Sequence, residues 1–189
     1  MKTVDEILKI KATVLYVLKK FLDGIDYIKL FKILYFAQQH HLVIYGKPIF
    51  NDTFQALKHG PVPSFSYRCF KNLEKGELIN DDVKTFTNSL DINKETKLIF
   101  GLEEPDLDEL SKANIRSLDY IIEKYKNFSS NELSELSHDE AWAKALKRAK
   151  KNSEDNRIFI IDIAIAGGAD KDMVKYIKEI QNIKKVLSF

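Results

Sequence analysis

Cysteine occurs only once in the 189 residues of this chain, at Cys69. One cysteine cannot close an internal disulfide, and it cannot supply the several thiolates of a multi-cysteine zinc site. The sequence therefore predicts a protein of a reducing compartment, and we expect a cytoplasmic one.

Long apolar runs are also missing. The first residues, MKTVDEILKIKATV, carry a charge every few positions, unlike the uninterrupted apolar core of a signal peptide. No later stretch approaches the roughly 18 apolar residues of a membrane helix. We therefore expect neither a secretion signal nor a membrane partner.

The chain has little excess charge of either sign. Its formal net charge is +2, whereas dedicated nucleic-acid-binding proteins usually show a stronger or more clustered basic excess. Hydrophobic residues make up 44% and charged residues 31%, which is typical of a globular domain. We see no internal repeat, low-complexity tract or linker, so residues 1–189 are interpreted as one domain.

What the sequence does contain is helical periodicity. Apolar residues recur at three- and four-residue steps from Ile7 to Phe21, before a stop at Asp23-Gly24. A second helix is expected from about Tyr27 to Tyr45, with Asp26 as its cap. It is apolar on nearly every side, which is typical of a central helix.

The rest of the chain predicts shorter elements. Asn51-Asp52, between two apolar runs, favours the turn of a β-hairpin. Residues 158–168 are ambiguous between a strand and a helix that ends at Gly167-Gly168. The other expected elements are a helix from Ser64 to Leu73, a strand near Leu98 that joins the hairpin, a long helix from Pro105-Asp106 to Tyr125, short helices at Ser129–Leu136 and from Ser137, and a last helix capped by Asp170. The predicted class is an α-dominated α+β fold, a single compact helical domain around the central helix with a small antiparallel hairpin or sheet.

Three groups of residues invite a catalytic or metal-binding interpretation. Ser137-His138-Asp139 has the residue types of a hydrolase triad, but consecutive residues cannot converge on one another, and a capping box with Glu140 explains Ser137 better. His40 and His41 are adjacent, whereas a helical metal pair needs a spacing of four. The acidic run at residues 103–109 is explained as a helix start. We expect no catalytic site, no metal and no cofactor.

The densest basic patch lies at Lys144, Lys147, Arg148, Lys150 and Lys151. On a helix most of these side chains share one face. A solvated face is the favoured interpretation, and the alternative is contact with phosphates or, equally, with an acidic protein partner.

The sequence KHGPVPSFSY, from Lys58 to Tyr67, combines a histidine with two prolines. Pro61 and Pro63 fix their own backbone angles and restrict the residue before each. They are expected to turn the chain out of a strand and into the next helix. His59 has no nucleophile or orienting acid near it in the sequence, so we do not expect it to be a catalytic base.

Three separated segments together resemble a known family. They are IKLFKILYFAQQHHLVIYGKPIFNDTFQALKHGPVPSFSY (28–67), LSELSHDEAW (133–142) and IDIAIAGGADKDMVKYI (161–177). They are similar to the Panacea domain family, whose members are SocA-like antitoxins or phage-associated proteins. Many members have Trp-x-Tyr where this chain has Leu57-Lys58-His59, and others place the second proline one residue later than Pro63. The middle of the chain, from about residue 75 to 112, matches poorly.

The resemblance implies a non-enzymatic antitoxin that neutralises a cognate protein toxin, encoded by a neighbouring gene, by forming a complex with it. A protease adaptor that delivers the toxin for degradation is a variant of that function, and a nucleic-acid-binding regulator that uses Lys144–Lys151 is a further alternative. For Trp142 the sequence leaves open a core role or a contact role. The residues expected to touch the toxin are Lys58, His59, Pro61, Tyr67, Arg68 and Trp142.

Overall fold

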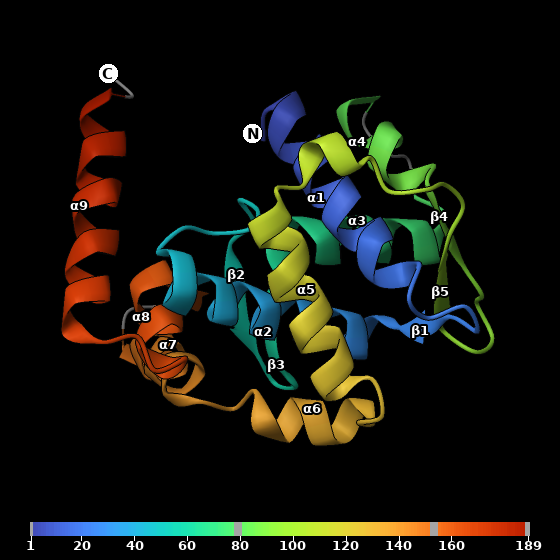
Figure 1. Cartoon of the computed structure of the whole chain (residues 1–189). Coiled ribbons are helices and arrows are strands. Elements are labelled where there is room, and N and C mark those ends of the chain that lie inside the picture. The colour runs from blue at the N-terminus through green and yellow to red at the C-terminus, as the bar shows by residue number, and fades with distance from the viewer. Residues whose placement is uncertain (1, 78–80, 152–154, 188–189) are drawn as a thin grey trace.

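The computed structural model describes residues 2–77, 81–151 and 155–187, which form an α-dominated α+β fold as predicted (Figure 1). The helices are α1 (Val4–Leu18), α2 (Tyr27–Tyr45), α3 (Ser64–Lys75), α4 (Asp81–Thr87), α5 (Lys112–Tyr125), α6 (Ser130–Leu136), α7 (Glu140–Lys151), α8 (Ile160–Ala166) and α9 (Lys171–Leu187), with a 3-10 helix, η1, at Leu107–Glu109. The strands are β1 (Ile25–Asp26), β2 (Phe54–Leu57), β3 (Gly60–Pro63), β4 (Leu90–Ile92), β5 (Leu98–Gly101) and β6 (Arg157–Ile158). Among the helices of the described residues, none is both long enough and apolar enough to span a bilayer.

Helix α2 is the central element, as its all-round apolar sequence predicts. The Asp26 carboxylate accepts a hydrogen bond from the Lys29 backbone N–H at its start, and Gly46 takes the left-handed conformation at its end. Its middle turns are buried, and α1, α5, α6, α8 and β3 all contact it. Local signals therefore defined both the bounds and the burial of this helix.

The strands of the described residues form two antiparallel sheets of three strands, β3-β2-β6 and β1-β5-β4. The strand expected near Leu98 is present as β5. It pairs with β1 and β4, however, and does not join the hairpin as predicted. The error has a simple cause, because strand partners are chosen by contacts between residues far apart in the sequence.

The hairpin is also present, but its predicted turn was wrong. β2 pairs with β3 so that Leu57 faces Gly60, which places Lys58 and His59 in the turn. Pro61 and Pro63 lie within β3 and do not redirect the chain out of the hairpin. β3 is an edge strand, and a missing proline N–H is tolerated there because one side of the strand has no ladder to complete.

Asp52 has a role other than the predicted turn. Helix α3 begins after Pro63, whose side chain makes no capping hydrogen bond. The Asp52 carboxylate takes over, accepting hydrogen bonds from the backbone N–H groups of Phe65 (3.0 Å) and Ser66 (3.1 Å). The loop before the hairpin is thereby joined to the helix after it.

We expect Asp52→Ala to lower the free energy of unfolding by about 2 kcal/mol, because it leaves two amide donors at the buried start of α3 unpaired. Urea unfolding measures the change. Asp106→Ala is the control, since Asp106 caps only the exposed η1, and we expect it to cost under about 1 kcal/mol. Equal losses in the two variants would contradict this role of Asp52.

Two predicted helix starts need correction. The helix expected from Pro105 begins at Lys112, because Ser111 and Asn114 cap it reciprocally. Ser137 does not open a helix: it ends α6, and Asp139 accepts the hydrogen bond from the Trp142 N–H in the first turn of α7.

Two other expectations about helix ends are settled. The ambiguous stretch contains α8, which ends at Ala166 with Gly167 as its C-cap, and Asp170 caps α9 as predicted. Helix α1 ends at Leu18, earlier than the predicted stop at Asp23-Gly24.

Candidate functional site

The turn of the β2–β3 hairpin presents Lys58 and His59 to solvent. Within the described part of the chain, neither side chain makes a hydrogen bond or an ion pair. The His59 backbone is held, since its carbonyl accepts a hydrogen bond from the Ser134 hydroxyl of α6 (3.2 Å). The two side chains are therefore exposed on a fixed backbone, and the His59 imidazole has no acid to orient it.

Trp142 holds the hairpin against α7. Its indole N–H donates a hydrogen bond to the Leu57 carbonyl at the end of β2 (2.9 Å). The His138 ring stacks on the indole, with ring centroids 4.1 Å apart and planes at 26°. Both side chains are half-buried, so Trp142 packs against the hairpin while part of the residue stays accessible to solvent. We call Lys58, His59, His138 and Trp142 the hairpin-tip surface.

The three residues that resemble a triad in sequence point in different directions. The Ser137 hydroxyl donates to the Ser134 carbonyl (2.8 Å). The Asp139 carboxylate accepts hydrogen bonds from the Tyr35 hydroxyl (2.8 Å) and the Gln39 amide (3.0 Å) of α2. Burial, together with the Asp139 charge, raises the pKa of Tyr35. The arrangement anchors α7 to the central helix and does not activate a nucleophile.

Sequence reasoning missed a buried lysine beneath the hairpin. Lys32 is fully buried, and its ammonium donates a hydrogen bond to the Pro61 carbonyl (2.8 Å). Burial lowers the pKa of Lys32 to about 7. A lysine inside a helix that is apolar all round was the available signal, because such a residue must find a buried acceptor or lose its charge.

Gly60 lies directly against this lysine. Its φ is +91°, and a Cβ at this position would lie 2.3 Å from the Ser137 hydroxyl oxygen and 3.0 Å from the Lys32 ammonium nitrogen. Only a glycine fits this backbone conformation and this spacing. The hairpin, α2 and the end of α6 thus meet at one crowded point.

The six residues expected to contact a toxin do not form one surface. Lys58, His59 and Trp142 come together at the hairpin tip. Pro61 is buried, which removes it from any exposed contact surface. Tyr67 and Arg68 lie on α3. The Tyr67 ring packs against Phe31, and the Arg68 guanidinium lies over the Phe65 ring.

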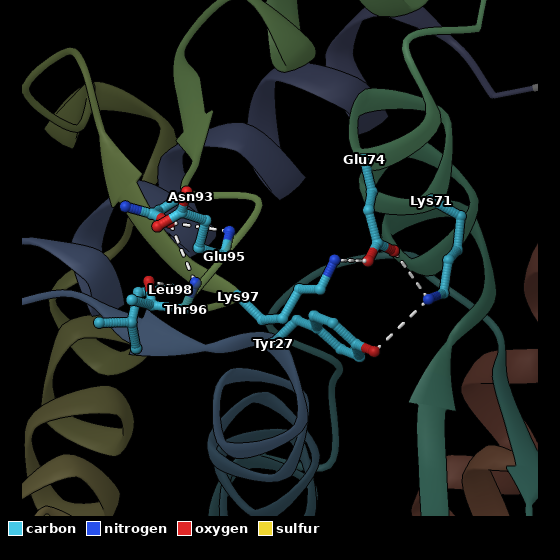
Figure 2. A network of polar contacts seen from close by, with 8 residues as sticks. All are labelled: Tyr27, Lys71, Glu74, Asn93, Glu95, Thr96, Lys97 and Leu98. Atoms are coloured by element: carbon cyan, nitrogen blue, oxygen red, sulfur yellow. Dashed lines mark hydrogen bonds and ion pairs between the residues drawn. The ribbon is translucent and has the colours of Figure 1, made fainter.

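A polar network joins α2, α3 and the turn before β5 (Figure 2). Its Lys71 ammonium also lies over the Tyr67 ring. Glu74 pairs with Lys97 (2.6 Å) and Lys71 (2.9 Å), and Lys71 in turn reaches the Tyr27 hydroxyl (3.4 Å). The hydrogen bonds from Lys97 and Lys71 lower the pKa of Glu74 to about 2. Glu74 therefore stays ionised at neutral pH and ties α3 to the β4–β5 sheet.

Two histidines of α2 contact the same serine. The Ser117 hydroxyl oxygen lies 3.2 Å from His40 Nδ1, and for the closer His41 the hydrogen bonds exclude a base. Ser117 lies 2.9 Å from His41 Nδ1, and the Asn114 amide nitrogen lies 3.1 Å from His41 Nε2. Because the Asn114 oxygen accepts from the Ser111 N–H, its NH₂ group faces Nε2, and Nδ1 must carry the ring hydrogen. All three side chains are buried, and burial lowers the pKa of His41 to about 4. The group is a structural contact between α2 and α5.

Other candidate sites are also accounted for. Within residues 2–77, 81–151 and 155–187, no three His, Cys, Asp or Glu side chains gather as metal ligands would. In the basic patch, Lys144 pairs with Asp162, and the Arg148 guanidinium lies 4.3 Å from the centre of the Phe159 ring. Two of the five basic side chains of this patch are therefore already in contact with other residues of the protein, which leaves fewer of them to bind the phosphates of a nucleic acid.

Comparison with known proteins finds a family whose model matches a segment that includes the hairpin tip. Residues 30–143, which are 114 of the 189, match the family model described as "Antitoxin SocA-like, Panacea domain". A segment of 53 residues is 43% identical to Antitoxin SocA of Caulobacter vibrioides, and this match covers 28% of each chain. No solved structure is significantly similar. Because the family model matches more than half of the sequence, the chain belongs to the family of SocA-like antitoxins with a Panacea domain.

Proposed function

We propose that this protein is an antitoxin that binds a protein toxin directly and blocks it by covering its active surface. The observation that carries the proposal is the extent of the family match, because residues 30–143 include the whole hairpin tip. The exposed Lys58 and His59 side chains stand on a backbone fixed by Ser134 and Trp142. These two side chains can therefore bind a partner without breaking a hydrogen bond or an ion pair among the described residues.

Inhibition by occupancy needs a sizeable interface, about 1,600 Å² in total, with a few anchor residues that carry most of the free energy. The hairpin-tip surface provides a cation, two imidazoles and a half-buried tryptophan. Tyr67 and Arg68 on α3 are a second patch within the same matched segment. Pro61 supports the hairpin from inside and is not proposed as a contact.

Co-expression with the product of the neighbouring gene tests this function. We expect that product to stop growth when it is expressed alone, growth to return with this protein, and the two to copurify. A toxin level that stays constant supports occlusion, whereas a falling level supports a protease adaptor. Failure of both growth rescue and copurification would overturn the antitoxin proposal.

Lys58→Glu is expected to weaken toxin binding about tenfold or more, because it reverses the charge of an exposed side chain at the hairpin tip. Lys94→Glu is the matched control, since Lys94 is also exposed and lies in the loop between β4 and β5. Both variants should keep the melting temperature of the wild type. If the two bind the toxin equally well, the hairpin tip is not the contact surface.

A further inference from the structure

Helices α2 and α5 together form an exposed face that has no part in the hairpin tip. Helix α5 crosses in front of the central helix (Figure 1). The two run in opposite directions, because Phe36 packs on Tyr125 and, one turn further along α2, His40 packs on Tyr120. The His40 and Tyr120 rings are stacked, with centroids 4.5 Å apart and planes at 24°.

Each helix extends this stack by residues one turn away. Arg116 and Lys124 lie four residues before and after Tyr120, and Ile44 lies four residues after His40. Residues at this spacing share one side of a helix. Ile44 and Tyr120 are 52% and 53% exposed, so two large apolar side chains face solvent here. We call His40, Ile44, Arg116, Tyr120 and Lys124 the α2–α5 face.

His40 is held in one orientation on this face. His41 Nδ1 donates its hydrogen to the Ser117 oxygen, which leaves the Ser117 hydroxyl hydrogen for His40 Nδ1 (3.2 Å). The ring hydrogen of His40 is then on Nε2. Among the described residues Nε2 has no hydrogen-bond partner, and it is open to solvent. Burial and the Lys124 charge lower the pKa of His40, so at neutral pH the ring is an uncharged N–H donor.

The charge of the α2–α5 face is positive. Among the described residues, Arg116 has no ion pair or hydrogen bond, and the Lys124 ammonium only lies over the Tyr125 ring, at 5.0 Å. Helix α2 contains no Asp or Glu, and α5 contains two, each paired with a lysine outside the face. These pairs are Asp119–Lys20 and Glu123–Lys126. The face therefore offers two cations and an N–H donor, and it favours a partner with carboxylates.

This charge argues against a second copy of the chain as the partner. A symmetric contact would bring the two cations of one copy towards those of the other, which costs binding free energy. A nucleic acid is also a poor fit. Two cations neutralise few phosphates, and Ile44 has no ring on which a base could stack.

We infer that the α2–α5 face binds an acidic segment of the toxin, whose apolar side chain packs on Tyr120 and Ile44 between two carboxylates. The inference rests on the proposed antitoxin function and adds a contact surface separate from the hairpin tip. Tyrosine and arginine are among the residues that most often carry the free energy of an interface. Arg116 and Lys124 are eight residues apart, or about 12 Å along the helix, which sets the spacing of the carboxylates.

Replacing Tyr120 by alanine in the full-length protein tests the apolar part of this contact. The side chain is exposed, so Tyr120→Ala should leave the melting temperature within a few degrees. Its affinity for the purified product of the neighbouring gene, measured by calorimetry, should fall at least tenfold. Leu102→Ala is the matched control, since Leu102 is 62% exposed and lies outside the face, and it should bind as the wild type does.

Arg116→Gln tests the charge. Binding of the same gene product should weaken severalfold, and raising the salt concentration should weaken the wild type more than this variant. Lys178→Gln is the control, because Lys178 is an exposed lysine of α9 that makes no ion pair among the described residues. It should keep the affinity and the salt dependence of the wild type.

The possible outcomes separate the two proposals. If the wild type neither binds nor neutralises the gene product, the proposed function fails, and the inference fails with it. If the wild type binds, and Tyr120→Ala and Arg116→Gln bind equally well, the α2–α5 face is not a contact surface, although the antitoxin function stands. A wild-type dimer that Tyr120→Ala converts to monomers assigns the face to a second copy. Duplex DNA that displaces the gene product from the wild type but not from Arg116→Gln assigns it to a nucleic acid, and either result overturns the inference.

Discussion

Replacing Gly60 by alanine is expected to destabilise the protein by about 3 kcal/mol. The φ of +91° alone costs a residue with a Cβ about 1–2 kcal/mol. The new Cβ would also lie 2.3 Å from the Ser137 hydroxyl oxygen and against Lys32, in a buried place that cannot expand freely. Overpacking of this kind adds about 1–3 kcal/mol. Urea unfolding of the variant and the wild type measures the sum.

Gly168→Ala is the matched control for this prediction. Gly168 has nearly the same φ, +92°, but a Cβ there would meet nothing within 4 Å. Its loss should therefore stay near the conformational cost, about 1–2 kcal/mol. Ser137→Ala removes the clashing oxygen, so it should cost less in the Gly60→Ala background than in the wild type. Equal losses at Gly60 and Gly168 would mean that packing contributes nothing.

The hairpin shows why a turn can be expected and still be misplaced. Asn51-Asp52 is a frequent turn dipeptide, and the prolines of HGPVP looked like the end of a strand. In the structure neither Lys58 nor His59 has a positive φ, and the left-handed residue is Gly60, directly after them. Asp52 is used instead to cap a helix that begins 12 residues later. No local sequence pattern reveals that Asp52 caps α3, because the contact depends on where the second strand of the hairpin brings the start of that helix.

The difference between local signals and contacts between distant residues also explains the rest of the fold and the site. The bounds of α2 followed from its apolar periodicity, Asp26 and Gly46, which are all local. The pairing of β5 with β1 and the hydrogen bond from Trp142 to Leu57 join residues more than 70 positions apart. Lys58, His59 and Pro61 were all expected to contact a partner; Lys58 and His59 are exposed, whereas Pro61 is buried. Local rules therefore described the elements, and the assembly decided which side chains face a partner.

The second large effect concerns pH and the buried Lys32. Burial holds its pKa in the folded protein at about 7, against 10.5 for an ordinary lysine. Between these two values the unfolded chain binds more protons than the folded protein, so the free energy of unfolding should rise as the pH rises. The rise approaches about 1.4 kcal/mol per pH unit, or about 2 kcal/mol from pH 7 to pH 9. Below pH 7 the lysine is protonated in both states, and the full cost of burying its charge remains.

We expect Lys32→Met to remove this slope, because methionine fills a similar volume and does not titrate. The variant should be more stable than the wild type at pH 6, and this advantage should shrink by about 2 kcal/mol between pH 7 and pH 9 as the folded wild type no longer has to bury a charge. The Pro61 carbonyl loses a hydrogen bond worth about 1 kcal/mol, which makes the advantage smaller at every pH. The urea unfolding measurements should not extend above pH 9. Burial raises the pKa of Cys69 to about 12, so at higher pH the thiol ionises in the unfolded chain first, and the free energy of unfolding falls. Lys94→Met, at an exposed position, should keep the wild-type slope. An unchanged slope in Lys32→Met would show that Lys32 takes up no proton on unfolding between pH 7 and pH 9. The lowered pKa of Lys32 would then be wrong.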